Sequence, residues 1–336
     1  MPREARLDYP GALHHVVARG VARGKIFGDD DDKRAFLGRM GELFRKSKTV
    51  CYAWSLMPNH FHLLLRTGAD PLWRVMQKLL TWYAIRYNHK YRRVGHFFQN
   101  RYKAILCEEE LYLLELVRYI HLNPLRAGMV EDLDGLRGYS WCGHRVILGG
   151  KTDGWQDVAF VLGLFDANKR KALEKYTDHI AEGIETVEKG DVSGGGLIRS
   201  AGGLEGLMAM IRNGDRIHGD SRILGSGEFV SSVIGKVEKR DRRRDGLGRR
   251  WNPEEVVKKA AVVVGVGRQE MMGRSRRSKV AEARALACKW LVEDIGMKGV
   301  SAARLMGITK SAVSKCITRG REVEAKLSVS LGDPAS

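Results

Sequence analysis

Cysteine is scarce in this sequence, and its few cysteines are not spaced as metal ligands. The 336 residues include five cysteines, an odd number, and no C-x-x-C pair. This excludes a disulfide framework and a zinc ribbon. Long apolar runs are missing too: the stretch Ala260 to Val264 is as long as any and far too short to cross a bilayer. Residues 1–6 lack the apolar segment of a signal peptide, so we expect a cytoplasmic protein with no membrane partner.

Acidic residues are in short supply relative to basic ones. Lys and Arg number 58 against 40 Asp and Glu, which gives a formal net charge of +18. An enzyme for small neutral metabolites needs no such excess, whereas a polyanion partner explains it, because neutralised phosphates release their counterions. Half of the net positive charge falls between residues 239 and 284, a segment that contains 15 basic and 6 acidic residues. Nucleic acid is therefore the expected partner.

The apolar pattern of the first 145 residues predicts an α+β fold. Period-two alternation favours strands over residues 14–18, 51–56, 61–65 and 102–107. Helices are expected to begin at Asp29, at Pro71 with Asp70 as its N-cap, and at Glu108. The third helix has to end near Asn123, because Pro124 disfavours helical backbone in the residue before it. The order β-α-β-β-α-β-α indicates a ferredoxin-like antiparallel sheet with helices packed on it.

The rest of the chain divides by composition and pattern. We expect a helical extension over residues 146–190 and a flexible, partly basic linker over 191–250, which contains clustered glycines. Residues 251–325 predict an all-α helix-turn-helix domain, and residues 326–336 a tail.

The helix-turn-helix is expected between Gly299 and Arg319. Apolar residues stand where two helices pack across a short turn, Gly307 supplies the turn, and Thr309 caps the second helix. That helix presents four polar or basic side chains to a DNA groove, namely Lys310, Ser311, Ser314 and Lys315. An ordinary helical hairpin is the alternative, and the basic flank favours a module that reads DNA.

Two groups of residues are candidates for chemistry. His60 and His62 lie two apart on a strand, so both imidazoles project from one face and can reach one cation. Tyr112, Tyr119 and Asn123 recur at helical spacing and share one face. A phenol can attack a phosphate when a cation neutralises it, and Asn123 offers a third ligand oxygen. The alternative is two core histidines beside an amphipathic helix with half-buried tyrosines.

The motif His60-Phe61-His62 followed by Tyr119-Ile120-His121-Leu122-Asn123-Pro124 resembles the single-tyrosine transposases named HUH after their His-hydrophobe-His motif. Within them it is similar to the REP-associated tyrosine transposases, which act on repetitive extragenic palindromes. The resemblance also includes Met57-Pro58-Asn59 and the stretch Gly95 to Lys103, and it covers about the first 145 residues. It implies an HUH transposase core, Tyr119 as nucleophile, and His60, His62 and Asn123 as ligands of Mg²⁺ or Mn²⁺.

Residues 274–284, together with the helix-turn-helix, resemble the DNA-binding fourth domain of the replication initiator DnaA. Residues 307–313 depart from the recognition sequence of that initiator, so its DNA site is not implied. The resemblance adds Arg276 and Arg277 as candidate contacts with duplex DNA.

The implied function is a metal-dependent transposase that cleaves and joins single-stranded DNA in hairpins or palindromes through a 5′-phosphotyrosine. Candidates for holding the hairpin are Arg74, Lys78, Arg86, Lys90, Arg92 and Arg93, for each of which a solvated helix face is the alternative. A monomer or homodimer is expected. Two alternatives remain: a non-catalytic DNA-binding regulator derived from a transposase, and a hydrolase that uses His60 and His62 to activate water.

Overall fold

The computed structural model describes residues 7–150, 154–184, 222–273, 275 and 277–333. The chain divides into two compact units, Met1–Val233 and Ile234–Ser336, and each has apolar core of its own. No helix within the described ranges is long and apolar enough to cross a membrane.

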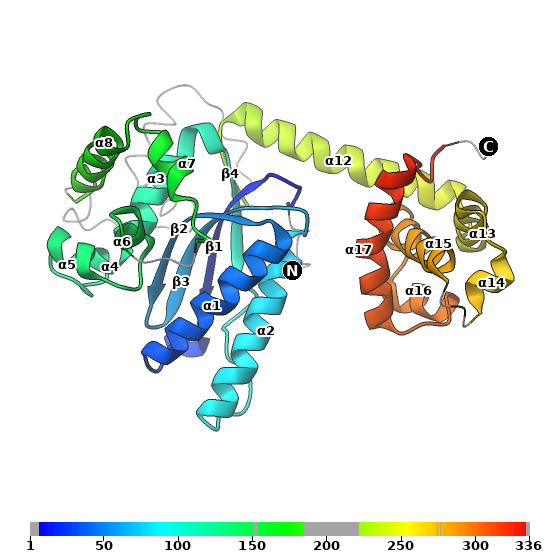
Figure 1. The fold of residues 1–336 in the computed structure, drawn as a ribbon, viewed down its shortest axis with the longest axis horizontal. Helices are drawn as coiled ribbons and strands as arrows, with labels where there is room; N and C mark the ends of the chain where they lie inside the picture. Colours follow the sequence, from blue (N-terminus) through cyan, green and yellow to red (C-terminus); the bar gives the residue numbers. More distant parts are fainter. Residues whose placement is uncertain (1–6, 151–153, 185–221, 274, 276, 334–336) are drawn as a thin grey trace. The chain divides into compact units, whose positions relative to one another are not determined.

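The described residues of the first unit form a five-stranded sheet (Figure 1). Its strands are β1 (Leu13–Arg19), β2 (Val50–Met57), β3 (His60–Arg66), β4 (Lys103–Cys107) and β5 (Ile223–Leu224), and a short 3-10 turn, η1 (Val21–Arg23), follows β1. The order across the sheet is β2-β3-β1-β4-β5, antiparallel among the first four strands and parallel between β4 and β5. The predicted α+β fold with a ferredoxin-like antiparallel sheet is confirmed.

Helices α1 (Asp30–Ser47) and α2 (Leu72–Lys90) pack against each other on one face of the sheet (Figure 1). α1 begins where expected, because the Asp29 carboxylate accepts a hydrogen bond from the backbone N–H of Asp32. α2 begins one residue later than expected: Pro71 is its N-cap, and Asp70 forms an ion pair with Arg74. The core beneath both helices contains Phe36, Met40, Phe61, Leu63 and Tyr83.

Helix α3 (Glu109–His121) packs on the opposite face of the sheet with several shorter helices. α3 ends just before Asn123, as Pro124 requires, and a new turn, α4 (Asn123–Arg126), begins there. The chain continues through α5 (Leu133–Gly138), α6 (Gly143–Ile147), α7 (Val158–Gly163) and α8 (Lys169–Glu182). Residues of α7 and α8 share one apolar core with α3, and Tyr176 is fully buried in it. The segment expected as an extension is thus an integral part of the first unit.

The region expected as a flexible linker is ordered from residue 222, whereas its first part, residues 191–221, lies outside the described residues. The N–H groups of Leu106 and Glu108 donate to the carbonyls of Arg222 and Leu224, both at 2.8 Å. α12 (Gly227–Arg250) follows, so the prediction of a linker is wrong for residues 222–250. Val230 and Val233 are buried one turn apart on this helix. Its many Glu, Lys and Arg residues favour helix strongly enough to outweigh its glycines.

The second unit is helical, as predicted. It contains α13 (Pro253–Val264), α14 (Arg268–Met272), α15 (Ser278–Lys289), a π-helical turn η2 (Trp290–Asp294), α16 (Gly299–Leu305) and α17 (Lys310–Leu327). Asn252 and Glu255 form a capping box that starts α13 at the expected place. Gly307 adopts φ 62° between α16 and α17, a left-handed conformation that favours glycine, and the Thr309 hydroxyl accepts a hydrogen bond from the Ala312 N–H. Two helices and a tight turn therefore occupy the segment predicted as helix-turn-helix.

The predicted tail packs against this unit as far as it is described. α17 extends to Leu327, and Leu331 is buried in the same core as α13. The Lys259 ammonium donates to the Leu331 carbonyl at 3.0 Å. The folded domain therefore extends past residue 325.

Candidate active site

Strand β3 places two histidines on the face of the sheet that α3 covers. Phe61 and Leu63 contribute to the core beneath α1 and α2, so His60 and His62 project from the other face. Their ring centroids are 5.0 Å apart, and the ring planes meet at 74°. The Nδ1–H of His60 donates to the side-chain oxygen of Asn59 at 2.6 Å, which orients the ring and leaves the lone pair on Nε2.

A third histidine, His15 of β1, belongs to this cluster, although nothing in the sequence pattern singled it out. Its Nε2 lies 2.9 Å from Nδ1 of His62, and the two rings stack at 5.2 Å and 17°. Val16 contributes to the core beneath α1 and α2, so His15 faces α3. With Nδ1 of His62 engaged, Nε2 is the nitrogen that His62 can offer to a metal. Only the antiparallel register, which pairs Val17 with His62, reveals this contact.

All three imidazoles are neutral at neutral pH. Burial lowers the pKa of His15 to about 4, with a further contribution from Lys103. Burial, together with the charge of Arg19, lowers the pKa of His60 to about 4. The pKa of His62 is well below its usual value, mainly because of burial, and the nearby histidines and two arginines add to the effect. Metal ligation requires the neutral form of imidazole, so His60 and His62 are in the competent state.

Helix α3 brings Tyr119 against the histidine cluster. The Tyr119 ring centroid is 5.8 Å from those of His15 and His62, and its edge-on contacts have interplanar angles of 79° and 78°. The side-chain amide of Asn123 donates to the Tyr119 carbonyl at 2.8 Å across the end of the helix, so its amide oxygen is the atom available as a ligand. Tyr112 is buried in the apolar core that α3 shares with the sheet. The structure thus brings together Tyr119 and the residues predicted around it.

The donor atoms of this cluster fit a divalent cation such as Mg²⁺ or Mn²⁺. His60 and His62 offer neutral nitrogens, and Asn123 offers an oxygen. Among the described residues, no group of three or more His, Cys, Asp or Glu side chains is placed to hold a metal. Two imidazoles and an amide bring no negative charge, so anionic substrate oxygens and water would have to complete the coordination.

A buried hydrogen-bond network ties α8 to the end of α3. The Tyr176 hydroxyl lies 2.9 Å from Nδ1 of His121 and 2.7 Å from Nδ1 of His144. All three side chains are buried, and a single hydroxyl can donate to one imidazole while it accepts from the other. His121 stands midway between Tyr119 and Asn123 in the sequence, so the network holds the segment that carries both.

We expect Tyr176→Phe to lower the free energy of unfolding of the first unit by about 1–3 kcal/mol, because two buried imidazole nitrogens lose their partner. Urea unfolding of the full chain, followed by circular dichroism, measures this change. Thr177→Val is the matched control: its hydroxyl binds the Leu173 carbonyl within the same helix and is only partly buried, so the change should stay within about 0.5 kcal/mol. A loss in Tyr176→Phe no larger than in the control would contradict a stabilising role.

The basic residues predicted along α2 fall into two groups. Arg74 forms an ion pair with Asp70 at 3.1 Å, and Lys90 binds Asp29 and Asp32 at 2.7 and 2.9 Å, so both have structural roles. The other predicted side chains, Lys78, Arg86, Arg92 and Arg93, are exposed. The guanidinium of Arg93 also packs over the Tyr87 and Phe97 rings.

The predicted DNA-reading side chains of the second unit are exposed on α17, namely Lys310, Ser311, Ser314 and Lys315. Arg277 is exposed as well and forms an ion pair with Glu270 at 3.1 Å. Arg276 lies outside the described residues.

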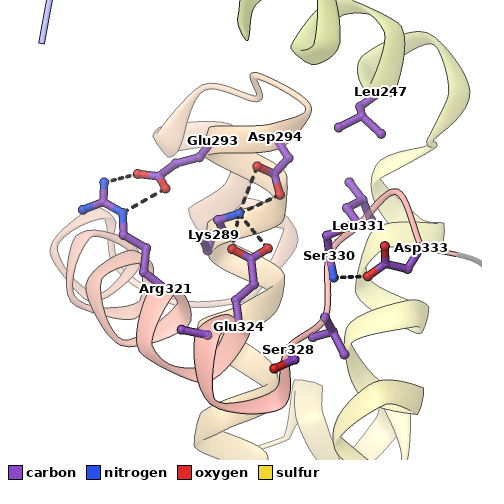
Figure 2. A pocket seen from close by; sticks show the side chains of 12 residues that line it. Leu247, Lys289, Glu293, Asp294, Arg321, Glu324, Ser328, Ser330, Leu331 and Asp333 are labelled. Atoms are coloured by element: carbon purple, nitrogen blue, oxygen red, sulfur yellow. Dashed lines mark hydrogen bonds and ion pairs between the residues drawn. The ribbon is translucent and has the colours of Figure 1, made fainter. Parts of the chain in front are cut away.

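The second unit also contains a pocket of about 620 Å³ between α15, α17 and the residues after α17 (Figure 2). Lys289 binds Asp294 at 3.0 Å and Glu324 at 2.6 Å, and Arg321 pairs with Glu293. These ion pairs join α15 and η2 to α17. None of the residues predicted for chemistry lines the pocket.

Residues 10–123, about a third of the chain, match the model of the family described as "Transposase IS200 like". These residues are similar to transposases, the class of enzymes that cut and join DNA, which confirms the resemblance to transposases seen in the sequence.

A solved structure titled "Structure of the REP associates tyrosine transposase bound to a REP hairpin" is similar over 47% of this chain and 90% of that chain. The identity is 14% and the TM-score 0.38. Comparison with curated proteins gives no match.

Proposed function

We propose that this protein is a REP-associated tyrosine transposase, an endonuclease and strand transferase for single-stranded DNA in hairpins or palindromes. The observation that carries the proposal is the contact between the rings of Tyr119 and His62, 5.8 Å between centroids, with the His60 ring 5.0 Å from His62. A phenol and two imidazoles then lie side by side, which supports phosphoryl transfer to Tyr119 with a metal on the histidines.

In the proposed reaction, the Tyr119 oxygen attacks the phosphorus of a phosphodiester and the bond to the 3′ oxygen breaks. The phenol proton passes to solvent, and the leaving oxygen takes up a proton to become a 3′-hydroxyl. The 5′-phosphate stays on Tyr119 until another 3′-hydroxyl attacks it, so joining needs no nucleotide hydrolysis. A Mg²⁺ or Mn²⁺ ion on His60, His62 and Asn123 would polarise the scissile phosphate. His15 keeps the His62 ring in place through the 2.9 Å contact between their nitrogens.

The exposed basic side chains along α2 and just after it would hold the phosphates of the folded strand. Lys78, Arg86, Arg92 and Arg93 are the residues concerned, whereas Arg74 and Lys90 already have acidic partners. Such contacts fix the position of the DNA without reading its sequence. Action on DNA would place the enzyme in the cytoplasm, and a monomer or homodimer stays a prediction.

Trapping with labelled DNA tests this proposal. The full chain is incubated with Mn²⁺ and fluorescent hairpins whose single-stranded flanks are randomised, and adducts that survive denaturing electrophoresis are sequenced. A covalent adduct at a defined position is expected. A regulator would bind hairpins without cutting them, and a hydrolase would cut them without an adduct. Either result would overturn the proposed chemistry.

The second unit would read duplex DNA through α17, whose exposed residues sit on a capped helix of the length that enters a major groove. Lys315→Ala and Ser314→Ala are expected to change which duplex is preferred, by about 1–3 kcal/mol for a residue that contacts a base edge. Arg277→Ala should weaken all duplexes alike and lower the magnitude of the salt slope by about one unit, as a phosphate contact does. Selection from random duplexes with the full chain, at two salt concentrations, measures both. Unchanged preference and unchanged affinity in all three variants would mean that α16 and α17 form an ordinary helical hairpin that does not read DNA.

A further inference from the structure

Helix α4 places a guanidinium directly on the proposed nucleophile. Arg126 lies over the ring of Tyr119, with its guanidinium carbon 4.9 Å from the ring centroid. It follows Asn123 by three residues, so one short helix carries both side chains. Arg126 is half-buried, and its charge also acts on His62. The contact is therefore part of the histidine and tyrosine cluster.

Arg126 has no acidic partner among the residues that the structure describes. It packs on the Tyr119 ring, and its charge interacts with His62 and with the guanidinium of Arg118. A second arginine, Arg19, ends β1 opposite His60 in the sheet register and likewise pairs with no described carboxylate. Arg118, one residue before Tyr119, differs from both, because it is paired with Glu115 and Glu182. The absence of an acid thus distinguishes the two arginines at the cluster from their neighbour on α3.

A half-buried cation without a counter-ion is unfavourable, since its hydration is reduced and nothing replaces it. The described side chains around Arg126 offer no compensation, because none of them is a carboxylate. The missing counter-charge has to come from a ligand. Guanidinium presents parallel N–H donors that match two oxygens of a phosphate, so a phosphodiester is the anion that fits best.

We propose that Arg126 binds the scissile phosphodiester, donating hydrogen bonds to its non-bridging oxygens while Tyr119 attacks the phosphorus, and that Arg19 contacts the same strand beside His60. This rests on the proposed function and adds a catalytic residue to it. Arg126 stays protonated throughout; the only bonds that change are the new bond from Tyr119 to phosphorus and the breaking bond to the 3′ oxygen. The role of Arg126 is to balance the charge on those oxygens, which the neutral metal ligands do not do.

The test removes the charge from each side of the contact in turn. Arg126→Ala is compared with the full wild-type chain on the trapped hairpin and on the same hairpin with a methylphosphonate at the cleaved position, where a methyl group replaces one charged oxygen. On the phosphodiester, the variant should form adduct about 10²–10³-fold more slowly than the wild type. On the methylphosphonate, the ratio of the wild-type rate to the variant rate should fall below about tenfold, because there is less charge for Arg126 to balance.

Arg118→Ala is the matched control, since it removes a neighbouring arginine that has acidic partners, and both of its ratios should stay near one. Arg126→Lys, which keeps the charge without the parallel donors, should lie between alanine and wild type. Thermal unfolding checks that each variant folds, and Arg126→Gln replaces alanine if that variant does not. Equal losses on the two substrates would assign Arg126 a structural role and overturn the inference.

A second readout separates this inference from the proposed chemistry. Binding of the hairpins in EDTA, measured by fluorescence anisotropy, does not depend on cleavage. Arg126→Ala should bind about tenfold more weakly and lower the magnitude of the salt slope by about one unit, while Arg118→Ala leaves both unchanged. If the wild type forms no adduct, the proposed function fails, and these affinities still decide whether Arg126 holds a phosphate. Equal affinities and slopes would show that it does not.

Discussion

Tyr119→Phe is expected to abolish the covalent protein–DNA adduct while the protein still folds and still binds the hairpin. The change removes one oxygen and keeps the ring, whose edge contacts with His15 and His62 and stacking under Arg126 hold this part of the site together. Without the nucleophile no phosphotyrosine forms, so the loss should be complete within detection rather than partial. Denaturing electrophoresis with labelled hairpins measures the adduct, and anisotropy measures the binding.

Tyr112→Phe is the matched control, because Tyr112 stands on the same helix and lies within the apolar core. Its adduct formation should stay near that of the wild type. The opposite pattern, with adduct kept in Tyr119→Phe and lost in Tyr112→Phe, would show that the other tyrosine is the nucleophile.

The second large effect is expected from the histidine pair. His62→Ala should slow adduct formation at least about 10²–10³-fold, because it removes a proposed metal ligand and also the partner of His15. Removal of divalent cations with EDTA should slow adduct formation by the wild type to the same extent. Added Mn²⁺ should restore adduct formation in the wild type but not in His62→Ala. Calorimetric titration of Mn²⁺ into the protein–hairpin complex should show binding to the wild type and not to His62→Ala.

His96→Ala serves as the control for that series, since His96 is an exposed histidine in the loop before β4. It should leave both adduct formation and Mn²⁺ binding unchanged. Cleavage by the wild type at full rate in EDTA would refute the metal assignment, whatever the behaviour of the variants.

The sequence predicted the sheet and its helices because the signals are local. Alternation of apolar residues marks a strand, and a cap or a proline marks a helix end, as Asp29 and Pro124 do. The same signals predicted the His60 and His62 pair and the face of Tyr119. One predicted helix start was wrong by a residue. α2 begins after Pro71 rather than at Pro71, because the Asp70 carboxylate pairs with Arg74 instead of capping the helix.

What the sequence did not predict depends on contacts between distant elements. His15 joins the cluster only through the register of β1 against β3. Arg126 is close to Tyr119 in the sequence, but α3 ends between them, so helical spacing does not predict its contact with the ring. The ion pairs of Lys90 with Asp29 and Asp32 cross from α2 to α1, so its structural role was equally hidden. α12 was mistaken for a linker because its charges resemble those of a solvated segment, although two valines on it are buried.

Strand β5, although only two residues long, determines where the first unit can be truncated. It covers the outer edge of β4, and the Glu108 carboxylate holds the start of the next helix through the N–H of Ser226 at 2.6 Å. A fragment that stopped at residue 145 or 190 would leave the N–H groups of Leu106 and Glu108 without these carbonyl partners and bare the edge of the sheet. Exposed strand edges pair with other chains, so such a fragment would tend to aggregate during expression. A fragment that keeps the first unit intact has to include Val233, 109 residues beyond Pro124, where the last motif of the resemblance ends.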